Sequence, residues 1–142
     1  MTREKKYVLM SIKPIYAEKI KNGEKTIELR KKIPNVKEDD IIIFYESNPV
    51  KRITMSCVIR SIITLEPEQM WELYHDQMGI ERERFDHYFV NSIKAYGIVL
   101  KDIKRIKAEE MKTLFSWMKH PPQSFRYVSE EDYQRVQSQE IE

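Results

Sequence analysis

Residues 7–30 read YVLMSIKPIYAEKIKNGEKTIELR, and the patterns in this stretch predict how the fold begins. Its first six residues form a short apolar run, which predicts a strand over residues 7–12. Pro14 limits that strand, because proline holds the residue before it in an extended conformation. Proline also suits the first turn of a helix, where its missing N–H costs nothing. A strand followed at once by a short helix is therefore expected.

That helix is expected to end at Asn22-Gly23, with Gly23 as its left-handed residue after the last turn. Ile15, Ala17 and Ile20 are expected to face the core. Residues 26–30 then alternate between polar and apolar side chains, which predicts a half-buried strand.

The rest of the chain predicts further short strands with helices inserted between them. Strands are expected at residues 41–45, 52–65, 95–107 and 124–128. Helices are expected in an insert at about 66–91, for a turn or two within 109–118, and in a polar C-terminal helix at about 129–138. Since a regular parallel α/β fold needs more helical crossovers, the expected class is α+β, a small mixed β-barrel with flanking helices.

Composition indicates one soluble domain over residues 1–142. The chain has a mass of 17.2 kDa and is 41% hydrophobic and 34% charged. No apolar run approaches the ~20 residues of a membrane-spanning helix, and residues 1–6 lack the apolar core of a signal peptide. The single cysteine, Cys57, fits a reducing compartment, so a cytoplasmic location without membrane contact is expected.

Charge is distributed unevenly along the chain. Residues 1–60 carry 14 Lys or Arg against 8 Asp or Glu, whereas residues 61–142 carry 11 against 15. This asymmetry favours an anionic partner for the first half. The alternative is an ordinary solvated surface.

The sequence lacks the residue patterns of several common functional sites. Three glycines cannot build a glycine-rich phosphate loop. His75, His87 and His120 lie far apart without the spacing of metal ligands, and Cys57 lies inside a predicted strand. Neither a metal nor another cofactor is expected.

Charged residues cluster instead where the first helix gives way to the next strand. Glu28 and Arg30 are two residues apart in an extended segment, so they point to the same side about 6.5 Å apart. They can meet each other or one shared ligand, and Lys25 lies at the mouth of the preceding turn. The alternative is a surface ladder of Glu and Arg beside a solvated lysine.

At these positions the sequence resembles the ASCH domain family, whose members are relatives of the PUA RNA-binding domains. The family signature G-x-K-x-x-E-x-R is matched by Gly23, Lys25, Glu28 and Arg30, and residues 9–17 resemble the strand and helix that precede it. The resemblance implies a PUA-like β-barrel with a cleft beside the signature loop. It also implies that the cleft binds RNA or a nucleotide-like ligand. We therefore expect an RNA- or nucleotide-binding module with a regulatory role.

The residue chemistry agrees with an anionic, flat-ringed ligand. Lys13 precedes the N-terminus of the first helix, which favours an anion. The fork of Arg30 suits phosphate or a base edge, and Glu28 can accept from a base amino group. Aromatic side chains can stack on unpaired bases. The candidate binding residues are Lys13, Lys25, Glu28, Arg30, Tyr45, Arg126 and Tyr127.

Two alternatives to a binding module stay open. Some members of the family are 4-acetylcytidine amidohydrolases, in which a lysine at the position of Lys25 acts with a threonine three residues later. Here that position is Glu28, so an amidohydrolase or ribonuclease using Lys25 and Glu28 is the second reading. The third is a protein-interaction adaptor whose helical insert presents Trp71 or Tyr74 to a partner.

Overall fold

The computed structural model describes residues 4–141, so residues 1–3 and 142 of the predicted domain lie outside the described residues. The strands are β1 (Tyr7–Ile12), β2 (Ile27–Arg30), β3 (Ile41–Glu46), β4 (Arg52–Leu65), β5 (Ala95–Glu109) and β6 (Phe125–Val128). The helices are α1 (Pro14–Lys21), α2 (Pro67–Tyr74), α3 (Arg82–Tyr88), α4 (Met111–Leu114) and α5 (Glu130–Gln137), with a 3-10 turn, η1 (His75–Gln77).

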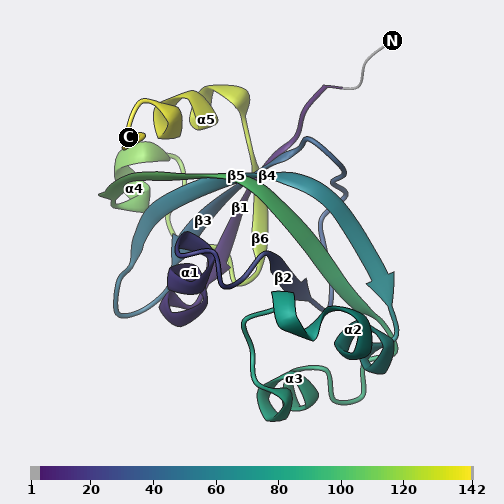
Figure 1. Ribbon diagram of the computed structural model, residues 1–142. Helices are drawn as coiled ribbons and strands as arrows, with labels where there is room; N and C mark the ends of the chain where they lie inside the picture. Colours follow the sequence, from purple (N-terminus) through teal and green to yellow (C-terminus); the bar gives the residue numbers. More distant parts are fainter. Residues whose placement is uncertain (1–3, 142) are drawn as a thin grey trace.

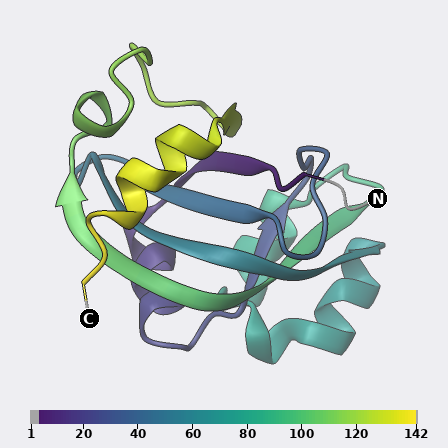
Figure 2. The same cartoon turned by 90° about the horizontal axis from the view of Figure 1, so that it is seen from above.

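The six strands form one mixed sheet in the order β2-β5-β4-β3-β1-β6. β1 runs parallel to β3, and the other neighbouring strands are antiparallel. The long strands β4 and β5 bend strongly, so the sheet curls into a half-barrel (Figures 1 and 2). The expectation of an α+β fold built on a small, mixed, curled barrel is confirmed.

The curled sheet has two end strands, β2 and β6, which do not pair with each other among the described strands. Three contacts nevertheless join the β2 end to the β1–β6 end. Arg30 in β2 donates to the Ser11 carbonyl in β1, and Asn35, in the loop after β2, contacts both Lys6 and Tyr127. We call the line of these contacts the seam.

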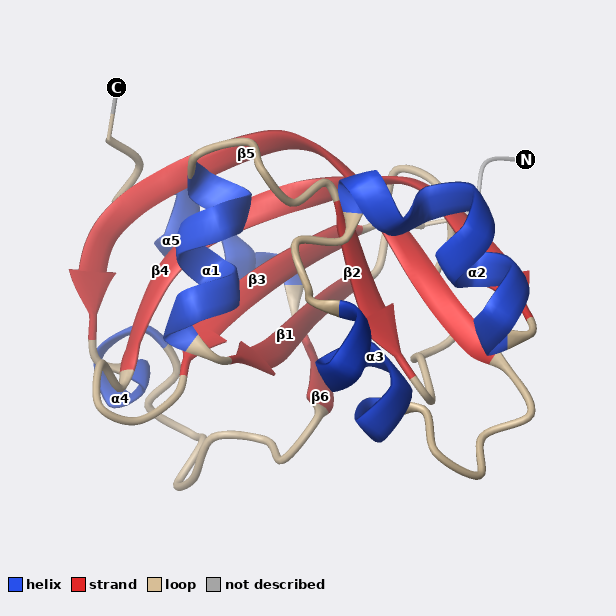
Figure 3. Cartoon of the chain, turned by 60° about the horizontal axis from the view of Figure 1, so that its bottom comes forward, coloured by secondary structure: helices blue, strands red, loops and turns tan. Residues whose placement is uncertain are grey.

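The core divides because strands β1 and β3 are covered on both faces. Val8 and Met10 of β1 pack with Ala17 and Ile20 of α1, whereas Leu9, between them, packs with residues of α4 and α5 on the opposite face. A third cluster lies between β2 and the helical insert, α2 to α3, which lies at the end of the molecule away from α4 and α5 (Figure 3).

One expected core residue of α1 is exposed. Ala17 and Ile20 are buried, but Ile15 is 57% exposed. Residues three apart share a helix face, whereas Ile15 precedes Ala17 by two, which places it about 200° around the helix. The expectation for Ile15 was wrong for this reason.

The helical segments follow their local signals. α2 and α3 each begin directly after an extended residue, and α2 has proline in its first turn. α5 begins after Ser129 with a complete capping box, in which Ser129 and Asp132 each accept from the backbone N–H of the other. No helix in the described part of the chain is long and apolar enough to cross a membrane.

Candidate ligand-binding site

The signature residues meet between α1, β2 and the helical insert. Gly23, with φ +86°, turns the chain after α1. Along β2, Ile27 and Leu29 pack toward the insert, so Glu28 lies on the other side of the strand. Lys25 is only 3% exposed and Glu28 only 6%. The sequence therefore brings charged groups together inside the protein, and the alternative of a solvated surface ladder does not describe them.

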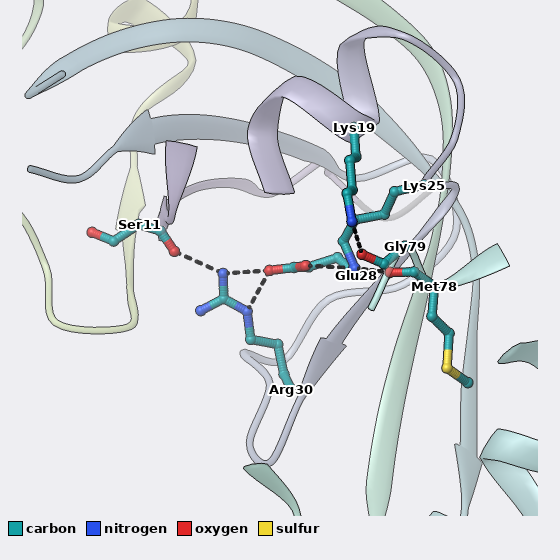
Figure 4. A network of polar contacts seen from close by, with 7 residues as sticks. All are labelled: Ser11, Lys19, Lys25, Glu28, Arg30, Met78 and Gly79. Atoms are coloured by element: carbon teal, nitrogen blue, oxygen red, sulfur yellow. Dashed lines mark hydrogen bonds and ion pairs between the residues drawn. The ribbon is translucent and has the colours of Figure 1, made fainter. Parts of the chain in front are cut away.

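Glu28 lies between two cations (Figure 4). Its Oε2 accepts from Arg30 Nη2 at 2.8 Å and from Arg30 Nε at 3.1 Å. Its Oε1 lies 3.4 Å from Lys25 Nζ. The carboxylate thus compensates both positive charges, which low exposure alone would make unfavourable. We call these three residues the charge cluster.

Backbone carbonyls complete the charge cluster. Lys25 Nζ donates to the Met78 carbonyl at 2.7 Å, and Arg30 Nη2 donates to the Ser11 carbonyl at 2.8 Å. Beside them Lys19 Nζ donates to the Gly79 carbonyl at 2.9 Å. The sequence did not predict these carbonyl partners, because every residue has a backbone carbonyl. Which carbonyl accepts a hydrogen bond from a given side chain depends on the fold.

The two central groups have shifted pKa values. Burial lowers the pKa of the Lys25 ammonium below its ordinary value, although the neighbouring Glu28 opposes that shift. Burial by itself raises the pKa of Glu28, but Arg30 and Lys25 outweigh it, so the net pKa lies below the ordinary value. Glu28 therefore stays ionised, while Lys25 gives up its proton more readily than a solvated lysine.

Arg30 connects the charge cluster to the surface. Its side chain is 11% exposed, and its Nη1 makes no hydrogen bond with the described residues, whereas Nε and Nη2 are engaged (Figure 4). The next residue, Lys31, places its Nζ 4.9 Å from the ring centroid of Tyr88, and Lys32 is exposed. One oriented donor with lysines beside it can take an anionic group.

Lys13 and Tyr45 lie differently with respect to this cluster. Lys13 is exposed and follows β1 two residues after Ser11, the residue that Arg30 contacts. Tyr45 is 8% exposed and packs in the core cluster under α4 and α5, on the sheet face opposite Met10 and Phe44. The Arg30–Ser11 contact across the seam brings Lys13 near Arg30, whereas Tyr45 lies apart from both.

Arg126 and Tyr127 lie on opposite faces of β6. The guanidinium carbon of Arg126 is 4.8 Å from the Trp117 ring centroid, beside α4 and α5. Tyr127 is 45% exposed, and its hydroxyl accepts from the backbone N–H of Asn35 in the loop after β2. Tyr127 therefore belongs to the seam with Arg30, and Arg126 does not.

The helical insert uses its aromatic residues internally. Trp71 lies 5.1 Å from Phe85 and 5.3 Å from His75 between ring centroids, and the Arg82 guanidinium carbon lies 5.1 Å from the Trp71 ring. Tyr74 packs against the same buried cluster. In the described part of the chain no group of three His, Cys, Asp or Glu side chains is placed to hold a metal ion.

Comparison with known proteins identifies relatives of this chain. A protein of Zymomonas mobilis named ASCH domain-containing ribonuclease is 26% identical over 138 residues, which are 95% of this chain and 93% of that protein. The crystal structure of ASCH from Zymomonas mobilis has a TM-score of 0.90 at 25% identity, covering 98% of this chain and 99% of that one.

A more distant likeness concerns the fold alone. The N-terminal domain of Staphylothermus marinus McrB has a TM-score of 0.53 at 12% identity, with 97% of this chain and 99% of that chain covered.

A family model described as the ASCH domain matches residues 10–132. Since that match spans well over half of the 142 residues and includes Lys25, Glu28 and Arg30, the chain belongs to the ASCH domain family.

Proposed function

We propose that this protein binds RNA where the charge cluster reaches the surface at Arg30, with Arg30 as the residue that contacts a phosphate. The observation that carries the proposal is the state of the guanidinium. Glu28 and the Ser11 carbonyl fix it from one side, and Nη1 keeps its donors for a ligand. A guanidinium held in this way loses little side-chain entropy when a phosphate binds.

Two further facts support RNA as the ligand. Lys13, Lys31 and Lys32 lie near Arg30 in the chain or the fold and are exposed, as phosphate-contacting lysines are. The Zymomonas mobilis relative is named a ribonuclease, so RNA is the ligand class to test first. Binding without turnover would correspond to a regulatory module.

The test is a titration of fluorescent single-stranded RNA at two salt concentrations. Arg30→Lys keeps the positive charge beside Glu28 but loses the fork, and we expect affinity to fall about ten-fold. The Lys31→Ala/Lys32→Ala pair should lower the slope of log affinity against log salt, by about 0.7 for each phosphate that these lysines neutralise in the wild type.

Matched variants elsewhere separate this site from the general charge of the protein. Arg60, exposed on β4, provides the control Arg60→Lys, and Lys107, exposed on β5, provides Lys107→Ala. Both controls should bind like the wild type. If Arg60→Lys and Arg30→Lys lose affinity equally, the site is not at Arg30.

RNA cleavage by Lys25 and Glu28 is the second candidate function. The observation that favours it is a buried lysine with a lowered pKa 3.4 Å from a carboxylate, in a chain related to a protein named a ribonuclease. A neutral Lys25 amine could accept a proton from a ribose hydroxyl, provided that the Met78 contact opens to admit the substrate.

Turnover assays distinguish cleavage from binding. RNA and acylated cytidines are incubated separately with the wild type, Lys25→Gln and the control Lys107→Ala. Cleavage of RNA that only Lys25→Gln abolishes supports a ribonuclease, and release of acid from acylated cytidine supports an amidohydrolase. Binding that Arg30→Lys weakens, without product from either substrate, supports the binding module alone.

A further inference from the structure

A hollow of roughly 940 Å³ lies at the β6 end of the seam. Its lining includes Lys5, Lys6, Asn35 and Tyr127, together with the acidic residues Glu4 and Glu130. Among the lining residues that the structure describes, the two lysines and the two glutamates balance in charge. Affinity for a ligand in this hollow is therefore expected from its shape and from the Tyr127 ring that lines it, rather than from net charge.

Tyr127 is exposed, yet it is held in place. Its hydroxyl accepts from the Asn35 N–H at 2.7 Å, and Lys6 Nζ lies 5.8 Å from its ring centroid. Lys6 Nζ also donates to the Asn35 carbonyl at 2.9 Å. Asn35 is therefore hydrogen-bonded to both Tyr127 and Lys6. The residue is 45% exposed. A flat ring fixed at its hydroxyl and open to solvent is a platform on which another ring can stack.

The hollow and Arg30 are connected through β1 and through the loop after β2. β1 places Ser11, which Arg30 contacts, three residues from Val8, which pairs with Tyr127. Three strand residues span about 10 Å. The loop that follows Arg30 carries Asn35 to the Tyr127 hydroxyl. One oligonucleotide strand can therefore contact both places at once.

We propose that Tyr127 stacks on an unpaired base of the same RNA strand whose phosphate contacts Arg30. This inference rests on the proposed function and deepens it, because it commits the ligand to single-stranded RNA. A paired base in a duplex is already stacked on its neighbours and does not offer its face to the ring. The Arg30 contact supplies the salt-dependent part of binding, and Tyr127 supplies a part that salt hardly changes.

The decisive experiment combines a protein variant with a ligand variant. A short fluorescent single-stranded RNA is compared with versions in which one base at a time is missing, leaving the sugar and phosphate. Each is titrated against the wild type and Tyr127→Ala. For the wild type, loss of one particular base should weaken binding about ten-fold or more. For Tyr127→Ala, loss of that base should have no further effect, and the salt slope should equal that of the wild type.

Tyr127→Phe keeps the ring and removes the hydroxyl. It should retain the response to base removal, and its thermal unfolding should show whether the Asn35 loop is still held. If Tyr127→Phe loses as much affinity as Tyr127→Ala, the residue acts through the loop and stacking is wrong.

The possible outcomes distinguish the stacking proposal from the RNA-binding function on which it rests. RNA binding that depends on Arg30, with base removal equally harmful to the wild type and Tyr127→Ala, overturns the stacking proposal and leaves the binding function standing. No binding of RNA by the wild type overturns both. A Tyr127→Ala variant that also lowers the salt slope would show that the hollow binds phosphate rather than a base.

Discussion

The two ends of the seam use polar groups in opposite ways. In the charge cluster Lys25 and Glu28 are buried and turn their charges toward each other and toward carbonyls. Around Tyr127, which is 45% exposed, Lys5 and Glu130 are exposed and Lys6 is half-buried, and the charges of the described lining residues balance. We therefore expect the charged signature to be needed for folding as well as for binding, whereas the groups around Tyr127 are available to a ligand.

The physical basis of this contrast is desolvation. A buried charge that loses its partner keeps the full penalty of leaving water, whereas an exposed group regains water when its partner is removed. Substitutions in the charge cluster should therefore change the free energy of unfolding most, and those around Tyr127 should change binding with little effect on stability.

The largest expected effect follows removal of the shared carboxylate. Glu28→Ala leaves Lys25 and Arg30 without their counter-ion, and we expect a loss of about 3–5 kcal/mol in the free energy of unfolding, measured by urea denaturation. The exposed Glu38 provides the control, since Glu38→Ala should stay within about 0.5 kcal/mol of the wild type. Equal losses in the two variants would contradict the view that the cluster is a folding element.

A smaller loss is expected where the insert meets Lys25. Gly79 has φ +62°, and a Cβ there would lie 2.9 Å from Lys25 Cβ. Gly79→Ala adds this clash to the cost of a left-handed alanine, about 1–2 kcal/mol by itself. Gly23 has φ +86° with nothing within 4 Å of a Cβ, so Gly23→Ala shows the backbone part alone. Thermal unfolding of both variants should show a larger loss for Gly79→Ala; the reverse order would mean that the insert is not packed against Lys25.

Acid should weaken the cluster in a defined direction. Burial raises the pKa of Glu28, but Arg30 and Lys25 bring it below its ordinary value of 4.5 in the folded protein. The unfolded chain then binds the proton more readily, so the stability due to ionised Glu28 is complete above about pH 4.5 and is lost as pH falls through the folded pKa. Urea denaturation across this range should show a shallower acid loss in Glu28→Gln than in the wild type. Parallel curves would refute the shift.

The smallest effect on stability is expected at the other end of the seam. Tyr127→Ala removes an exposed ring and one hydrogen bond to Asn35, so the free energy of unfolding should fall by only about 1 kcal/mol. Urea denaturation of this variant beside Glu28→Ala measures the contrast between the two ends directly. If Tyr127→Ala lost as much stability as Glu28→Ala, Tyr127 would be needed for folding, and the contrast between the two ends of the seam would be wrong.

Local patterns in the sequence determined much of the architecture. The apolar run before Pro14, the Gly23 stop and the alternation of residues 26–30 predicted β1, α1 and β2 in order. The predicted strand over 52–65 coincides with β4. The same alternation placed Glu28 and Arg30 on one side of β2, where they contact each other. These features depend on neighbours in the chain, so the sequence suffices for them.

Which side chains share a surface depends on how distant segments pack against one another in three dimensions. β3 is buried on both faces, so its sequence could not show that Tyr45 packs under α4 and α5. Nor could alternation along β6 tell which of Arg126 and Tyr127 faces the seam. The carbonyls that hold Lys25 and Arg30 come from distant segments and have no sequence signature of their own. The alternation of residues along a strand determines which side chains share a face of that strand. Which helix, loop or solvent each face contacts depends on the packing of elements far away in the sequence.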